Sequence, residues 1–307
     1  MAQIFSSFDQ LKAMYDKELY SNVFVMASLM LTSCEQNFET LNSSSKYLTM
    51  VYYGHSAFKL AQYKKAETIY RQALHYKKTI IKIKNIKPSE NPSKDLMPDI
   101  DVKFNLHICH LKLGHSELAI ETIQSIPGRQ RNAKINMTLA KLCQKYSMER
   151  TAISAYKEVL KECPLAIEAA EGLLSLGVSG AEVASLVIET NVSGFEWYAA
   201  WIKAKALFYA RSYKEAITAF KTLDESGGLR GNHSLLVNIG EAYHYIGDNK
   251  NAISILQRAR AGEPAMQRGL DILAFLLMHE KKNLMIWKEL SVHGLDTLKI
   301  VLKYVLR

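Results

Sequence analysis

Three histidines and one cysteine lie close together in the chain, at His107, Cys109, His110 and His115. Imidazole and thiolate groups are common protein ligands of zinc, so this stretch is the first candidate for chemistry. If the stretch is helical, His107 and His110 share one face whereas Cys109 points elsewhere, and no fourth ligand follows at a suitable spacing. Histidines of the core or the surface explain the same pattern, and we therefore expect no metal site.

Patterns that mark common catalytic sites are absent from the sequence. It contains neither the G-x-S-x-G turn of a serine nucleophile, nor a phosphate-binding Walker loop, nor the H-E-x-x-H pair of zinc proteases. The cysteines are Cys34, Cys109, Cys143 and Cys163. Because they form no C-x-x-C pair, we expect buried free thiols. We predict that the protein is not an enzyme and uses no cofactor.

The stretch from His233 to Pro264 indicates which elements position side chains in this protein. Counted from His233, small residues stand at positions 8 and 20 (Gly240 and Ala252), and Gly247 stands at position 15. This is the spacing of a tetratricopeptide repeat, in which two antiparallel helices occupy about 34 residues. Small residues let the two helices approach closely, and the glycine supplies the positive φ that ends the first helix. The stretch therefore predicts a helical hairpin.

The same spacing recurs along the chain, with repeats that begin at Tyr47, Ala133 and Trp197 and a first, atypical repeat over residues 8–32. We therefore predict an all-α fold, a right-handed superhelical solenoid of antiparallel helix pairs. The predicted regions are N-terminal repeats over 1–77, a basic flexible insertion over 78–99, further repeats over 100–264 with a degenerate unit at 165–196, and a last repeat with a divergent C-terminal helix over 265–307.

Stacked repeats curve so that their first helices line a concave face, which is where such arrays bind partners. The repeat from Ala133 presents a basic set with one apolar member on that face, and the repeat from His233 presents a mixed set. The candidate partner-binding residues are Lys134, Met137, Lys141, Lys145, Glu241, His244 and Tyr245. An acidic or mixed peptide segment would suit the lysines, and a solvated helix face explains them equally well.

The composition of the 307 residues narrows the possible partners. The formal net charge is +9, and many of the lysines lie between Lys77 and Lys87, just before Pro88. No aromatic residues alternate with these lysines, so a solvated basic segment is favoured over nucleic-acid binding. No apolar run reaches the length of about 18 residues that a membrane span needs. We expect an intracellular protein that binds neither nucleic acid nor membrane.

Several strings that the repeat spacing does not require resemble a particular family. They are IPGRQR (residues 126–131), GAEVAS (180–185), WIKA (201–204) and GDNKN (247–251). Together they are similar to the subunit 7 family of the anaphase-promoting complex, over roughly residues 1–278. Family members continue through further repeats, whereas this chain ends on the apolar string LKIVLKYVLR. We expect a second helix from Trp287 and Leu290, and either further repeats beyond it or a shortened form of a longer protein.

The resemblance implies a non-catalytic scaffold of a multi-subunit E3 ubiquitin ligase that drives cell division. It also implies homodimers formed through the N-terminal repeats, stacking with other tetratricopeptide-repeat subunits, and a place in the nucleus and cytoplasm. The alternative is a stand-alone adaptor that binds acidic peptide segments in its concave groove. A co-chaperone clamp for a peptide carboxylate is disfavoured, because only part of its set is present. The residues at the corresponding positions are Trp201, Lys205, Asn238, Arg268 and Ile272.

Overall fold

A computed structural model of the chain describes residues 6–36, 41–83, 99–188, 196–226 and 229–279. Within these ranges every regular element is a helix, in agreement with the predicted all-α class. The chain divides into two compact units, Met1–Met148 and Glu149–Arg307, and each is described by itself. In the described ranges, each helix is too short or too polar to span a lipid bilayer.

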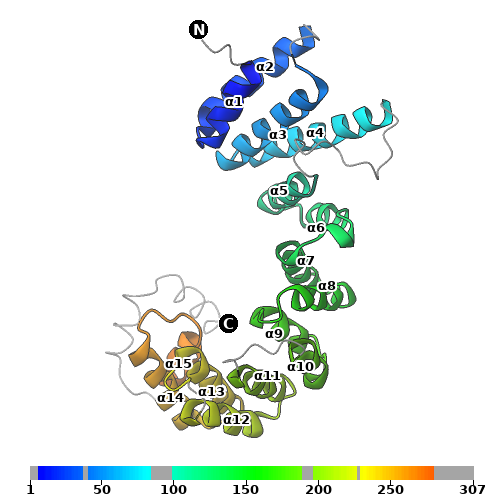
Figure 1. Ribbon diagram of the computed structural model, residues 1–307. Coiled ribbons are helices and arrows are strands. Elements are labelled where there is room, and N and C mark those ends of the chain that lie inside the picture. The colour runs from blue at the N-terminus through cyan, green and yellow to red at the C-terminus, as the bar shows by residue number, and fades with distance from the viewer. Residues whose placement is uncertain (1–5, 37–40, 84–98, 189–195, 227–228, 280–307) are drawn as a thin grey trace. The chain divides into compact units, whose positions relative to one another are not determined.

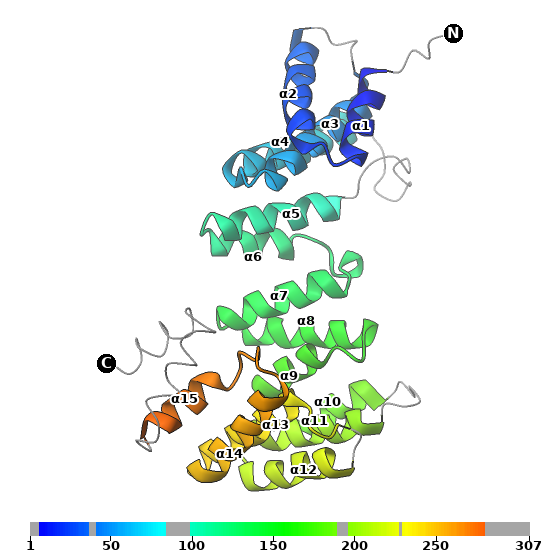
Figure 2. The same ribbon diagram turned by 90° about the vertical axis from the view of Figure 1, so that its left-hand side faces the viewer.

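The first unit is a series of helices in which each packs against the next (Figures 1 and 2). Its helices are α1 (Ser7–Asp16), α2 (Tyr20–Gln36), α3 (Ser43–Lys59), α4 (Tyr63–Ile83), α5 (Asp99–Lys112), α6 (Ser116–Gln124) and α7 (Ala133–Lys145), with a short 3-10 helix at Gly128–Gln130. The apolar faces of α1 to α5 form one continuous core around Tyr47 and Tyr70, both of which are fully buried.

The second unit repeats the same arrangement of paired helices (Figure 2). Its helices are α8 (Glu149–Glu162), α9 (Ile167–Ser175), α10 (Gly180–Ile188), α11 (Glu196–Tyr209), α12 (Tyr213–Ser226), α13 (His233–Tyr245), α14 (Asn249–Gly262) and α15 (Leu270–His279). The degenerate unit predicted at 165–196 contains the two shortest of these helices, α9 and α10. Helix α9 also packs on α11, so the first helices of successive repeats are in contact.

The α13–α14 hairpin shows why small residues recur at fixed positions. A Cβ atom added to Gly240 would lie 2.6 Å from Leu256 Cγ, so any larger residue would force either this side chain or the two helices to move. Ala252 is fully buried in the same contact region. Gly247 has φ +81°, a conformation that glycine adopts without steric cost, and it follows the last turn of α13. The physical role predicted for each of these residues is confirmed.

Asparagine side chains fix where several first helices begin. Asn132 Oδ1 accepts a hydrogen bond from Ile135 N (3.0 Å), and Asn232 Oδ1 accepts one from Leu235 N (3.1 Å). Such a cap contributes about 1 kcal/mol to helix stability. Helices α7 and α13 therefore begin at the residues where their repeats were expected to begin. Helix α3 begins at Ser43, four residues before Tyr47, because Asn42 caps it.

The basic segment differs from the expectation at both of its edges. Helix α4 continues through Ile83, into the region predicted as a flexible insertion. Lys77 is buried, and its Nζ lies 2.6 Å from Asp99 Oδ1 at the start of α5, so this lysine is an ion-pair partner in the fold and is not solvated. Residues 84–98 lie outside the described ranges, as does the expected second helix from Trp287 and Leu290.

The cysteines follow the expectation in three cases out of four. Cys34, Cys109 and Cys143 are buried free thiols. Cys163 is free but exposed, so the prediction of burial is wrong for this residue. The physical reason is its place at the end of α8, directly before Pro164, where the chain has left the helix–helix contact.

Candidate partner-binding surfaces

The lysines predicted on the first unit form an exposed row along α7. Lys134, Lys141 and Lys145 are exposed and follow one another at intervals that return to the same face of a helix, and Met137 is half-buried beside them. Lys134 Nζ lies 4.7 Å from the centre of the Phe104 ring on α5, so a cation–π contact holds this ammonium group close to the protein surface. Chemically, this face can attract carboxylates.

The residues predicted on the second unit, Glu241, His244 and Tyr245, all lie on α13. Glu241 accepts two hydrogen bonds from Arg268, at 2.9 Å from Nε and 2.6 Å from Nη2, so its charge is neutralised. His244 is half-buried, with its ring centre 6.2 Å from that of Phe275. Tyr245 is 57% exposed and stacks on Tyr213 at 5.0 Å. His244 and Tyr245 therefore form an aromatic surface next to the ion pair of Glu241 with Arg268.

A buried polar network connects three successive first helices with the turn before α15. Lys205 on α11 is only 1% exposed, and its Nζ donates to Asn238 Oδ1 on α13 at 2.9 Å and lies 3.1 Å from Glu171 on α9. Arg268, which precedes α15, donates from Nη2 to the same Asn238 oxygen at 2.9 Å. Burial lowers the pKa of Lys205, and the Glu171 carboxylate opposes that shift. Two cations and two carboxylates thus balance within the network.

The network brings together three residues of the clamp that was disfavoured from the sequence. Lys205, Asn238 and Arg268 meet at one point, although they are far apart in the chain. Asn238 is fully buried, and its Nδ2 has no hydrogen-bond partner among the described residues. Because Glu171 and Glu241 neutralise the two cations, the cluster carries no excess positive charge that would attract a peptide carboxylate. The sequence signal was a lysine placed between two alanines, Ala204 and Ala206, on a first helix.

The histidine-rich stretch of α5 separates into two environments. His107 is buried beside Phe104, and burial lowers its pKa to about 4. Burial also raises the pKa of the Cys109 thiol to about 12, so this group is a protonated packing residue and not a nucleophile. His110 is buried on the side of α5 that faces Glu67 of α4. Glu67 lies 43 residues before His110 in the chain, so the spacing of the histidines gave no sign of it.

Known proteins are similar in sequence to this protein over nearly its whole length. No protein-family model matches it. The chain is 38% identical over 284 residues to subunit 7 of the anaphase-promoting complex of Mus musculus, a match that covers 90% of this chain and 50% of that protein. The subunit of the same name from Arabidopsis thaliana is 25% identical over 290 residues, which is 88% of this chain and 51% of that protein.

Solved structures agree on the fold. A tetratricopeptide repeat protein from Parabacteroides merdae superposes with a TM-score of 0.55 at 17% identity, over 85% of this chain and 99% of that one. At this level of identity the likeness concerns the fold alone. The chain spans about half the length of the curated relatives it matches. By fold it is therefore a tetratricopeptide-repeat protein, and by sequence it is similar, over nine tenths of its length, to half of subunit 7 of the anaphase-promoting complex.

Proposed function

We propose that this protein is a non-catalytic scaffold subunit of an anaphase-promoting ubiquitin ligase and that it supports cell-cycle-dependent ubiquitination. The observation that carries this proposal is its similarity to subunit 7 over 90% of its length, on a fold made of stacked helix pairs. Its partners would be a second copy of itself and other tetratricopeptide-repeat subunits, in the nucleus and cytoplasm. A chain that serves as a scaffold needs surfaces for these partners.

Helix α2 offers the surface that suits a second copy. From Tyr20 to Cys34 it contains no charged residue, although one of its faces lies at the surface. Val25 is 57% exposed and Leu29 is 62% exposed, one helical turn apart, whereas Val23 and Ala27 point into the core and are fully buried. An exposed apolar row on a helix without charges is typical of a buried interface in an oligomer. We assign the homodimer contact to this face of α2.

Charge placed on α2 tests the dimer. The double substitution Val25→Asp and Leu29→Asp should convert a dimer to a monomer in light scattering, because it buries two carboxylates in an apolar contact. Leu118→Asp on α6, where the leucine is 39% exposed, is the matched control and should leave the mass unchanged. A wild-type protein that is monomeric at micromolar concentration would remove the homodimer from the proposal. Co-purification with other repeat subunits tests the scaffold role independently.

The alternative function, an adaptor for acidic peptide segments, rests on the exposed lysines of α7. Lys141→Glu with Lys145→Glu reverses two charges of that row. Loss of binding to a fluorescent acidic peptide, with the oligomeric mass retained, would support the adaptor. Unchanged binding, or no binding by the wild type, would remove it and leave the scaffold role intact.

A further inference from the structure

A buried histidine whose Nδ1 lacks a hydrogen bond to any described residue lies between α4 and α5. His110 is 1% exposed, and its Nδ1 makes no hydrogen bond within the described ranges. Glu67 Oε1 lies 3.8 Å from this nitrogen, which is too long for a hydrogen bond. Glu67 itself is 5% exposed, so a carboxylate and an imidazole face each other in the interior across a gap. An unpaired buried polar group of this kind costs about 1–3 kcal/mol.

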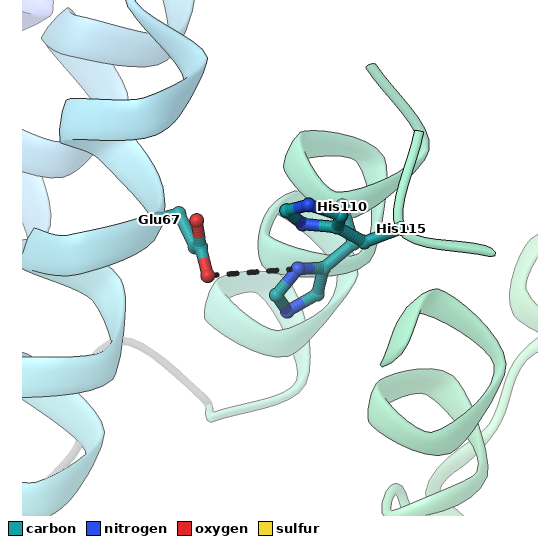
Figure 3. Close-up of side chains that lie close together, drawn as sticks. All are labelled: Glu67, His110 and His115. Atoms are coloured by element: carbon teal, nitrogen blue, oxygen red, sulfur yellow. Dashed lines mark ion pairs between the residues drawn. The ribbon is translucent and has the colours of Figure 1, made fainter. Parts of the chain in front are cut away.

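The end of α5 brings a second imidazole to the same place. Gly114 has φ +80° and turns the chain back at the end of the helix. The His115 N–H then donates to the His110 carbonyl at 2.8 Å, the long bond of a Schellman turn, which couples the two histidine backbones. Figure 3 shows both rings beside the Glu67 carboxylate. One ligand atom from each of Glu67, His110 and His115 lies within 4.8 Å of the other two.

We propose that Glu67, His110 and His115 bind a zinc ion. Two imidazoles and one carboxylate are a known zinc ligand set, with the fourth position left to water. Ligand atoms at about 2.1 Å from zinc in a tetrahedral site are about 3.4 Å apart, so ligand atoms that now lie within 4.8 Å of one another must close by up to about 1.4 Å. His115 can supply this movement because it is exposed and its side chain makes no capping bond at the start of α6. The two buried ligands are already held in place by α4 and α5.

Two surface cations hold the Glu67 carboxylate in the structure described here. Lys64 Nζ lies 3.1 Å from Oε2, and Arg71 Nη2 lies 3.0 Å from Oε1, the oxygen that faces His110. Both heads are mostly in water, since the side chains of Lys64 and Arg71 are 73% and 52% exposed. They can therefore swing away when the metal arrives. Arg71 competes directly with zinc for Oε1, and this competition is open to measurement.

The zinc ion would join two helices that the chain itself connects only through residues 84–98. Glu67 lies near the beginning of α4 and His110 near the end of α5, whereas Lys77 and Asp99 pair near the other ends of the same two helices. The metal would thus be a second tie across the α4–α5 contact. Since the folded chain holds the ligands close and the unfolded chain does not, zinc would stabilise this unit.

Metal binding by the full chain tests the proposal. Protein freed of metal with a chelator is titrated with Zn²⁺ against a chromophoric competitor, and one ion per chain is expected. His115→Ala removes a direct ligand and should weaken binding at least about 100-fold, since loss of an outer-shell partner alone costs about 10–100-fold. The chain should stay folded because His115 is exposed. His75→Ala changes another exposed histidine, on α4, and should leave the affinity unchanged. The proposal would be overturned if zinc bound equally well to His115→Ala, or if the wild type did not bind one ion per chain.

A second variant tests whether Glu67 is a ligand, and it should raise the zinc affinity where His115→Ala lowers it. Arg71→Gln removes the competitor at Oε1 and should tighten zinc binding about threefold or more, the effect of a modest surface ion pair. Cobalt(II) in place of zinc should show the visible bands of a four-coordinate site without thiolate charge transfer, which separates this site from binding at Cys163. Weaker or unchanged binding by Arg71→Gln would exclude Glu67 from the ligand set.

Discussion

Two buried polar contacts, one in each unit, differ in how completely they are satisfied. Between α9, α11 and α13 of the second unit, Lys205 has two partners, and Asn238 Oδ1 accepts from both Lys205 and Arg268. Between α4 and α5 of the first unit, His110 Nδ1 faces Glu67 across 3.8 Å. The first contact nearly completes itself with groups of the protein. In the second, His110 Nδ1 lacks a hydrogen bond to any described residue, and this difference identifies the contact as the better candidate for an added ligand.

The polar network of the second unit should also influence how successive repeats fit together. A buried ion pair adds little net stability, because removing two charges from water costs about as much as their attraction returns. Breaking it is costly, since a charge is then left without a partner. The network should therefore define how α9, α11 and α13 align. If the comparison is correct, substitution of Asn238 should lower the free energy of unfolding strongly. Acid should lower it mainly through the histidines of the first unit.

Asn238→Leu should have the largest effect. It removes the oxygen that accepts from both Lys205 and Arg268, and it should lower the free energy of unfolding by about 3 kcal/mol. Denaturant titration followed by circular dichroism measures this loss. Adding Lys205→Met removes the ammonium group that has lost one of its two partners and should restore about 1 kcal/mol. A loss below about 1 kcal/mol for the single variant would show that the network is less important than its geometry suggests.

Acid should destabilise the first unit through His107. The pKa of this histidine is about 4 in the folded protein and 6.5 without the fold, because burial, followed by the nearby charges of His110 and Lys134, disfavours the protonated form. The unfolded chain binds the proton first, so this contribution is full above pH 6.5 and is lost as the pH falls toward 4. Between pH 7 and pH 5 the loss should be about 2 kcal/mol.

His107→Gln is the variant that isolates this effect. It keeps a side chain of similar size but cannot titrate, so its stability should fall less between pH 7 and pH 5 than that of the wild type. The readout is the difference in unfolding midpoint at the two pH values. Parallel profiles for the two proteins would show that His107 is not the acid-sensitive group.

The smallest effect should come from glycine substitutions at two turns, one in each unit, and it should be equal in the two. Ala61 and Arg211 have φ values of 58° and 63° at the turns that follow α3 and α11. A side chain in this conformation costs about 1–2 kcal/mol, part of which glycine returns as extra entropy of the unfolded chain. Ala61→Gly and Arg211→Gly should therefore each stabilise by about 0.5 kcal/mol. Gly247→Ala is the reverse substitution at the same kind of turn, where φ is +81°, and it should lower the stability. A gain in stability for only one of the two variants would mean that the two units differ in these turns as well as in their buried polar contacts.

The repeat pattern predicted most of the fold because its small residues and glycines stand where helices pack closely or the chain turns. Gly240 and Gly247 could be assigned roles from their spacing alone, and the all-α class is confirmed. The start of α3 could not be placed, because the cap at Asn42 lies outside the repeat spacing. The buried Lys77 was also missed, since its partner Asp99 follows the basic segment and sequence separation hides the ion pair.

The candidate sites were less predictable because they depend on distant residues. The basic row on α7 follows from helical spacing, and its lysines are exposed as expected. The pairing of Glu241 with Arg268 does not follow from either residue alone. Likewise, Glu67 joins His110 only because α4 and α5 pack together, so a search for metal ligands in nearby sequence could not include it.

The ion pair between Lys77 and Asp99 has a consequence for engineering. It holds the end of α4 to the beginning of α5, so the two helices keep their register whatever chain length connects them. Loop-closure entropy rises slowly, by about 0.6 kcal/mol for each doubling of length. An epitope tag or a small reporter domain inserted within residues 84–98 should therefore be carried without loss of the stacked repeats, which makes this connection a convenient handle on the protein.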